Sequence, residues 1–163
     1  MIAVGASRDH GFTLLEVLVA LLVLSVGLLG LAGLQTFSLK NNNGALMRSQ
    51  AVALAYDALD LMRGNRDAAL KGSASWYQTN FSDDDVETVA CSPCSSDDQA
   101  QNDIAAWKQS IVTLDLPRGE GQIEIADVAG GDAVKVTVRV RWDDDRDGNN
   151  DGVNEVVFVE SLL

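Results

Sequence analysis

The chain has 163 residues, a length that suits a single domain with a modest core. Its 24 acidic and 12 basic residues give a formal net charge of −12 at pH 7. This excess of acid argues against a nucleic-acid-binding surface, which needs clustered lysine and arginine. The acid lies far from the N-terminus, in runs such as Asp83 to Asp85 and Asp143 to Asp151, so the C-terminal part is expected to be acidic and solvated.

An apolar segment near the N-terminus runs from Val17 to Leu34, and Ser25 is its one residue that is neither apolar nor glycine. The segment has 18 residues, the length of a membrane-spanning helix. Glu16 directly precedes it, and a carboxylate is costly at membrane depth unless it is protonated or has a partner. The sequence therefore predicts a transmembrane helix with a functional carboxylate at its start.

Residues 11–16, Gly-Phe-Thr-Leu-Leu-Glu, together with this apolar segment resemble the class III signal of type IV pilins and pseudopilins. The resemblance implies that a prepilin peptidase cuts between Gly11 and Phe12 and that the new N-terminal Phe12 is N-methylated. It also implies that Glu16 pairs with the N-terminal amine of a neighbouring subunit during assembly. Such pairing has a physical reason of its own, because an amine and a carboxylate are both costly in lipid.

Two other interpretations of the N-terminus remain open. The segment could be an ordinary signal anchor, with Glu16 near the membrane interface by chance. It could also be a cleaved secretory signal, since residues 30–33 (Gly-Leu-Ala-Gly) resemble the small-residue site at which such signals are cut. The helical pattern continues beyond that point, which argues against the second interpretation.

From Thr13 to about Arg63 the sequence predicts one long helix. Three glycines between residues 27 and 33 are expected either to allow close contact between helices or to loosen the helix as the subunit leaves the bilayer. Residues 41–44 (Asn-Asn-Asn-Gly) mark the exit from the membrane zone, and the pattern beyond them is amphipathic. The stripe expected to pack on a globular domain is Val52, Ala55, Leu59 and Met62.

The remaining chain is expected to add a second helix and a sheet. A helical turn is expected near residues 65–70, followed by an irregular stretch and then a helix over 104–113 that is capped by Asn102 and Asp103. Alternating patterns predict strands over 122–126, 134–142 and 154–161, with a turn at 130–131. The expected core or covering aromatics are Trp76, Tyr77 and Phe81, and the apolar face of the second helix is Ile104, Trp107, Ile111 and Leu114.

These elements predict an α+β fold. A long N-terminal α-helix, transmembrane in its first half and amphipathic in its second, packs on a small antiparallel β-sheet head. The resemblance divides the chain into a leader peptide over 1–11, a transmembrane and assembly helix over 12–40, and a periplasmic pilin head over 41–163.

Cys91 and Cys94 form a CxxC in the part expected to be exported, where disulfides persist. Zinc would need a second pair of ligands, and the only histidine, His10, lies in the leader. A thioredoxin-type redox role would need a βαβ context, which the pattern lacks. We therefore expect a short structural disulfide that shapes a loop.

Residues 143–154 nearly fit the calcium loop D-x-D-x-D-G-x5-E. Asn154 stands where the bidentate glutamate belongs, and the predicted context is a hairpin, so the segment is not an EF-hand. Clustered oxygen ligands suit Ca²⁺, but the same residues are also common in solvated turns, which would need no cofactor. The candidate ligands are Asp143, Asp145, Asp147, Asn149 and Asp151.

Within the superfamily the signal region looks like both the PilV-type minor pilins, the type IV pilus modification proteins, and the I-type minor pseudopilins of type II secretion. The CxxC loop and residues 105–107, 116–119 and 141–143 look more like the PilV type. The resemblance implies as partners the prepilin peptidase, other minor and major pilins, the inner membrane and the pilus assembly platform, with no nucleic acid.

Two functions of other classes remain. One is a membrane-anchored calcium-binding or adhesive domain whose leader is never cut. The other is an enzyme, which is not expected, because the only histidine lies in the leader and no glycine-rich phosphate loop is present.

Overall fold

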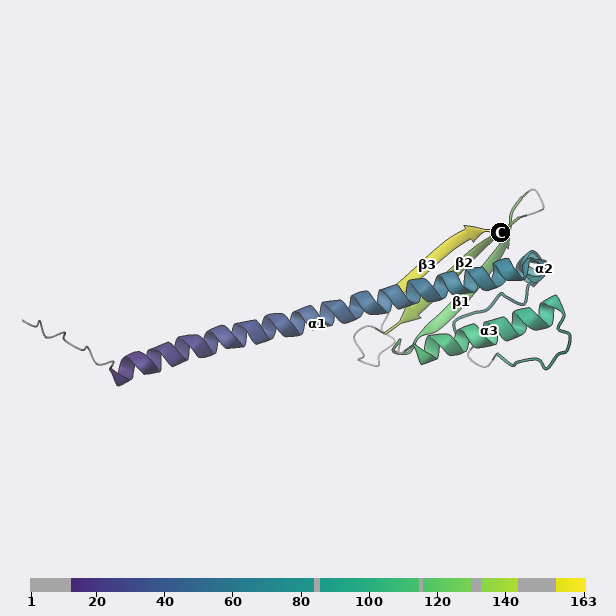
Figure 1. Ribbon diagram of the computed structural model, residues 1–163. Coiled ribbons are helices and arrows are strands. Elements are labelled where there is room, and N and C mark those ends of the chain that lie inside the picture. The colour runs from purple at the N-terminus through teal and green to yellow at the C-terminus, as the bar shows by residue number, and fades with distance from the viewer. Residues whose placement is uncertain (1–12, 84–85, 115, 130–132, 144–154) are drawn as a thin grey trace, which may run out of the picture. The chain divides into compact units, whose positions relative to one another are not determined.

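The computed structural model describes residues 13–83, 86–114, 116–129, 133–143 and 155–163. The chain divides into two compact units, Met1–Asn43 and Gly44–Leu163, which we call the N-terminal and C-terminal units. The elements in chain order are the helix α1 (Leu14–Gly64), the short helix α2 (Arg66–Ala69), the 3-10 turn η1 (Gly72–Ala74), the helix α3 (Ser96–Thr113) and the strands β1 (Glu120–Asp127), β2 (Val134–Trp142) and β3 (Glu155–Leu162) (Figure 1).

The long helix predicted from the sequence is confirmed by α1, which differs from the expected span by one residue at each end. It remains helical through Gly27, Gly30 and Gly33 and through the asparagine run at residues 41–43. The boundary between the two units falls directly after that run, within the helix.

In the C-terminal unit, α3 and the part of α1 from Gly44 onward cover one face of a three-stranded antiparallel sheet with the order β1-β2-β3 (Figure 1). Ile123, Val138 and Val159 lie opposite one another across the three strands. The predicted α+β fold and the three strands are confirmed, with ends that shift by one or two residues. The turn expected at 130–131 lies outside the described residues.

Three of the four residues predicted for the core stripe of α1, Ala55, Leu59 and Met62, are buried. Val52 is 37% exposed, so its placement in the stripe is wrong. The indole Nε1 of Trp107 on α3 donates a hydrogen bond to the carbonyl of Leu54 on α1 at 2.8 Å. The buried residues of α1 are Met47, Ala51, Leu54, Ala55, Ala58, Leu59 and Met62.

The second helix, α3, begins eight residues before the predicted Ile104, at Ser96, so the irregular stretch before it is shorter than predicted. Ser95 is the N-cap, and its hydroxyl accepts a hydrogen bond from the backbone N–H of Asp98 at 3.1 Å. The carboxylate of Asp98 in turn accepts from the backbone N–H of Ser95, which completes a capping box. At the other end of the expected apolar face, Leu114 is 40% exposed.

The three aromatic residues of the irregular stretch have different environments. Tyr77 is fully buried, and its hydroxyl lies 2.5 Å from a carboxylate oxygen of Asp103 on α3. Trp76 is 54% exposed and is not the core anchor expected from the sequence. Phe81 covers the outer face of the sheet, with its ring centroid 4.1 Å from the guanidinium carbon of Arg141.

Candidate functional site

The described part of the predicted assembly site begins at Thr13, because Gly11 and Phe12 lie outside the described residues. Thr13 precedes α1, and its Oγ1 accepts a hydrogen bond from the backbone N–H of Glu16 at 3.3 Å. A threonine at the N-cap with a glutamate three residues later has the spacing of a capping box. The position of Glu16 therefore also has a local explanation, because a negative side chain in the first turn is favoured by the helix dipole.

Two hydroxyl groups, that of Ser25 in the apolar segment and that of Thr36 just after it, are satisfied within the helix. Ser25 Oγ donates to the carbonyl of Leu21 at 2.7 Å, and Thr36 Oγ1 donates to the carbonyl of Ala32 at 3.0 Å. The carboxylate of Glu16, by contrast, has no hydrogen bond or ion pair with any residue that the structure describes. It is the one charged side chain between Leu14 and Leu39, and it needs a partner from outside the helix if this segment lies in lipid.

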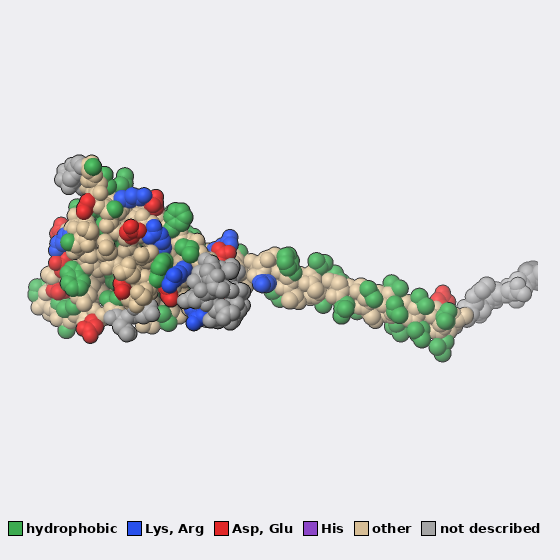
Figure 2. Space-filling view, turned by 180° about the vertical axis from the view of Figure 1, so that it is seen from behind, with side chains coloured by type: hydrophobic (Ala, Val, Ile, Leu, Met, Phe, Trp, Pro, Cys, Tyr) green, Lys and Arg blue, Asp and Glu red, His purple; other side chains and the backbone are tan. Residues whose placement is uncertain are grey.

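The described residues of the N-terminal unit, 13–43, are all exposed. Figure 2 shows hydrophobic side chains along this segment. Among the described residues α1 is the one helix long and apolar enough to cross a membrane. A Cβ atom added at Gly27, Gly30 or Gly33 would meet nothing within 4 Å. The two roles expected for these glycines, contact between helices and loosening, therefore stay predictions.

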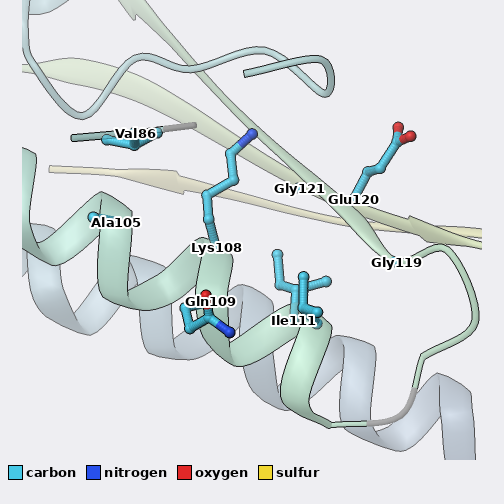
Figure 3. Close-up of a pocket in the computed structure, with 9 residues that line it drawn as sticks. Val86, Ala105, Lys108, Gln109, Ile111, Gly119, Glu120 and Gly121 are labelled. Atoms are coloured by element: carbon cyan, nitrogen blue, oxygen red, sulfur yellow. The ribbon is translucent and has the colours of Figure 1, made fainter. Parts of the chain in front are cut away.

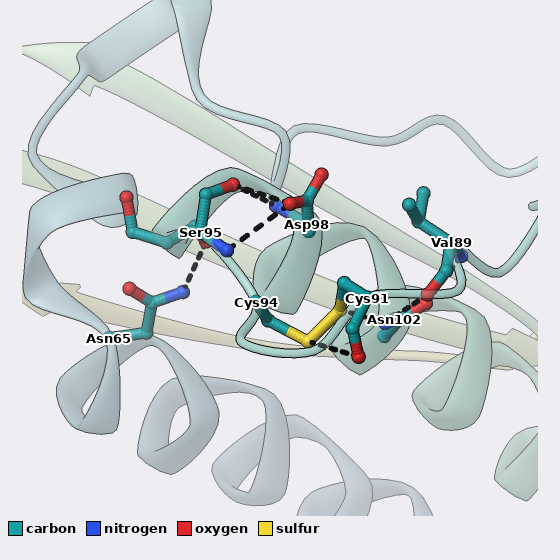
Figure 4. Close-up of a disulfide and its surroundings, with 8 residues drawn as sticks. Asn65, Val89, Cys91, Cys94, Ser95, Asp98 and Asn102 are labelled. Carbon is teal, nitrogen blue, oxygen red and sulfur yellow. Dashed lines mark hydrogen bonds between the residues drawn. A yellow bond between two sulfur atoms is a disulfide. The ribbon is translucent and has the colours of Figure 1, made fainter.

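In the C-terminal unit, Cys91 and Cys94 form a disulfide directly before α3 (Figure 4). Cys94 adjoins the N-cap Ser95. Asn102, from the second turn of α3, holds the segment that leads to the disulfide: its Oδ1 accepts from the backbone N–H of Val89 at 2.7 Å, and its Nδ2 donates to the carbonyl of Val89 at 3.0 Å. Asn102 thus anchors the loop instead of capping the helix, and the disulfide lies where it shapes the entry to α3.

Most of the predicted calcium loop lies outside the described residues. Asp145, Asp147, Asn149 and Asp151 fall in the range 144–154, and of the candidate ligands only Asp143 is described. Asp143 is buried, and its backbone N–H donates to the carbonyl of Pro117 at 2.9 Å. Within the described ranges, no three histidine, cysteine or acidic residues come together as a metal site. Calcium binding therefore stays a prediction.

A small pocket of about 130 Å³ lies between α3 and β1 (Figure 3). Lys108 rises from α3 beside it, and its Nζ donates to the carbonyl of Asn80 at 2.6 Å. Glu120 on β1 forms an ion pair with Arg141. Ligand pockets usually exceed roughly 300 Å³. Because this pocket is smaller and its charged groups are engaged, it does not suggest a substrate, and the absence of enzyme activity stays a prediction.

One comparison with known protein families finds a match at the N-terminus of the chain. The model of the prokaryotic N-terminal methylation motif matches residues 6–32, a range that contains Gly11, Phe12, Glu16 and most of the apolar segment. No curated protein and no solved structure matches the chain. The chain carries a type IV pilin-like prepilin signal. Together with the apolar helix, this signal supports a membrane-anchored pilin-like or pseudopilin protein that prepilin peptidase processes and that associates with pilins.

The sequence interpretation missed two contributors to the described sites. Thr13 is bonded to the backbone of Glu16, and the T-x-x-E spacing of residues 13–16 is a signal that could have found it. Asn102 was assigned to a cap, because asparagine before an apolar face is typical of an N-cap. The pair Ser95 and Asp98 carries the stronger signal, a reciprocal cap at the required spacing.

Proposed function

We propose that the chain is a minor type IV pilin of the PilV type. Prepilin peptidase cuts between Gly11 and Phe12, Phe12 is N-methylated, and α1 anchors the mature protein in the inner membrane with its C-terminal unit in the periplasm. The protein then joins the pilus or primes its assembly. The observation that carries this proposal is the prepilin-type signal placed in register with Glu16, whose carboxylate has no partner among the described residues of an otherwise apolar segment.

The proposed role of Glu16 follows from the cost of charge in lipid. Cutting after Gly11 creates an amine on Phe12, four residues before the carboxylate. An isolated charge at membrane depth costs several kcal/mol, and an ion pair between neighbouring helices offsets part of that cost for both groups. The subunit is therefore driven to leave the lipid environment by pairing with other pilins.

The choice of a PilV-type minor pilin over an I-type minor pseudopilin rests on the resemblance of the CxxC loop and of residues 105–107, 116–119 and 141–143. Two of these segments lie together, because the backbone N–H of Asp143 donates to the carbonyl of Pro117 at 2.9 Å. Recovery of type IV pilus subunits as partners is the result expected of a PilV-type protein. Recovery of secretion pseudopilins instead would contradict this choice.

The experiment compares Glu16→Val with Ser25→Val in cells that produce the full-length chain. Ser25 lies in the same segment and its hydroxyl is satisfied within the helix, so it is a matched control. Both variants should be processed and held in the membrane at wild-type levels. Glu16→Val alone should lose co-purification of partner pilins, because a neighbour's Phe12 amine would remain unpaired.

Processing is read in the same cells by mass spectrometry of the mature N-terminus. A start at Phe12 is expected in the wild type, and Gly11→Val should leave a full-length precursor. A mature N-terminus at Met1 or near Ala32 would support the anchor or the secretory-signal interpretation. Normal capture of pilins by Glu16→Val would contradict an assembly role.

A further inference from the structure

The strand β3 lies at an edge of the sheet and carries a row of exposed apolar side chains on its outer face. Among the described residues β2 is its one neighbouring strand. Val156, Phe158 and Leu162 are exposed, Phe158 at 65%. Glu160 belongs to the same row, and Lys135 on β2 holds its carboxylate at 2.9 Å. The strand has no proline, and its one charge on this face is paired, so it lacks two of the features that often block pairing at a sheet edge.

The hydrogen bonds at the end of β3 determine which main-chain groups face its open side. Val134 and Leu163 exchange two hydrogen bonds, at 3.3 and 3.1 Å. Such pairs alternate along an antiparallel ladder with pairs that exchange none. In the observed register, the odd-numbered residues 155–161 therefore bond to β2 through their main chain. The main-chain N–H and C=O groups of the even-numbered residues 156–162 point away from it.

The opposite edge of the sheet is engaged within the chain. By the same alternation Ile123 on β1 points outward, and it exchanges two hydrogen bonds of 3.0 Å with Thr79. On β3, the carbonyl of Leu162 accepts from the neighbouring Ser161 hydroxyl at 3.3 Å. No other outward main-chain group of β3 has a hydrogen-bond partner in the part of the chain that the structure describes. Within the described part of the chain, β3 is the edge whose outward main-chain groups are left for a further strand.

We propose that β3 accepts an extended strand of another pilin-type subunit as the fourth strand of this sheet. The identity of that partner rests on the proposed function. Outward donors and acceptors at every second residue are matched by an extended strand and not by a helix. The row formed by Val156, Phe158 and Leu162 lies on the same face and would contact apolar side chains of the added strand.

The negative net charge of the C-terminal unit favours a neutral or basic partner over a second copy of the chain. All but two of the 24 acidic residues and all but two of the 12 basic residues follow Asn43, so the net charge of −12 belongs to the C-terminal unit. Figure 2 shows acidic and basic side chains close together on this unit. Lys135, Arg139 and Arg141 on β2 form ion pairs with glutamates of β1 and β3. Because the basic groups on the outer face of the sheet are already paired, two copies would meet with like charge.

Cross-linking of the full-length protein in cells tests which segment covers β3. A photoactivatable residue placed at Phe158 should form cross-links to a β-strand of a protein with a prepilin-type signal, identified by mass spectrometry of the linked peptides. The matched control position is Val112 on α3, which is apolar and similarly exposed at 67%, and it should not give the same linked peptide. Cross-links from Phe158 to a helix, to a second copy or to no protein would overturn the proposal.

Proline variants test the main-chain contacts, with the photoactivatable residue moved to Val156. Phe158→Pro removes an N–H that points outward and leaves every hydrogen bond between β2 and β3 in place, and strands accept proline at such positions. The melting temperature should stay close to that of the wild type, while the cross-link yield falls about tenfold. Val159→Pro removes an N–H that faces β2, and it should lower the melting temperature instead.

A second variant covers the case in which Phe158→Pro does not fold. Phe158→Lys keeps the main-chain groups but places a charge among the apolar side chains and against a neutral or basic partner, so it should also reduce the cross-link. Wild-type cross-linking in Phe158→Lys, or in folded Phe158→Pro, would overturn strand addition. If processing at Gly11 and capture through Glu16 are normal in those cells, the failure concerns β3 alone. If both are absent, the proposed function is wrong and the proposed partner is wrong with it.

Discussion

Gly121 on β1 lies against two side chains of α3, and its replacement by alanine is a sharp test of the packing. A Cβ atom at this position would lie 2.4 Å from Cη2 of Trp107 and 2.5 Å from Cδ1 of Ile111. Both side chains are almost fully buried, and the indole of Trp107 is bonded to the carbonyl of Leu54. Neither can move away freely, so Gly121→Ala should cost about 1–3 kcal/mol of unfolding free energy, as overpacked cores do.

Thermal unfolding followed by far-UV circular dichroism measures this cost. For a unit of this size each kcal/mol lowers the melting temperature by roughly 3–5 °C, so a fall of about 3–15 °C is expected. Gly64→Ala is the matched control. Gly64 is the last residue of α1, and a Cβ there would meet nothing within 4 Å, so this change should be neutral or stabilising by up to about 1 kcal/mol.

A double-mutant cycle tests the cause of the loss. Trp107→Phe removes the part of the indole that contains Cη2 and Cζ3. These are two of the three atoms nearest to the added methyl group, and the third is Cδ1 of Ile111. In that background Gly121→Ala should cost about 1 kcal/mol less than in the wild type. An equal cost in both backgrounds, or no cost in the wild type, would refute the steric reasoning.

Three further predictions concern the loop, a buried tyrosine and calcium. Cys91→Ser should lower the unfolding free energy by no more than about 2 kcal/mol, because the loop that the disulfide closes is short. Asn102→Ala leaves the disulfide intact and should speed amide hydrogen exchange at Val89 about tenfold or more. Unchanged exchange at Val89 would contradict the anchoring role of Asn102. Burial, and then the hydrogen bond to Asp103, raise the pKa of Tyr77. Its stabilising contribution is therefore complete below about pH 10, the unfolded value, and is lost as the pH rises further, so the wild-type melting temperature should fall more steeply than that of Tyr77→Phe above about pH 10. If the acidic loop binds Ca²⁺, EDTA should lower the melting temperature and Asp145→Ala should remove the difference, whereas equal curves with and without calcium would leave a solvated turn.

The sequence by itself determined the features that depend on residues close together in the chain. The prepilin-type signal is a matter of register over residues 11–16 and the apolar segment, and a match over residues 6–32 supports it. The period of the apolar residues was enough to predict α1 and the three strands, because a helix and a half-buried strand place their side chains with different repeats. From these elements the α+β fold followed.

The errors arose where two local signals competed or where a side chain's surroundings were distant in sequence. Asn102 and Ser95 are both good helix caps, and the reciprocal bond between Ser95 and Asp98 favours the earlier start of α3. Trp76 and Tyr77 are adjacent aromatic residues, yet of the two only Tyr77 is buried, and its hydroxyl lies against Asp103 on α3. Local pattern cannot rank such neighbours, because burial depends on which other elements cover them.

Only the tertiary structure decided how the elements meet. The sequence gives no reason for glycine at position 121, which depends on Trp107 and Ile111 of α3 packing against β1. It also does not tell an edge strand from a central one, because side-chain alternation reports the two faces of a strand and carries no information about its two main-chain edges. The pairing of β1 with Thr79, and the side of β3 that has no neighbouring strand among the described residues, follow from the order and register of the strands, which are set by contacts between distant parts of the chain.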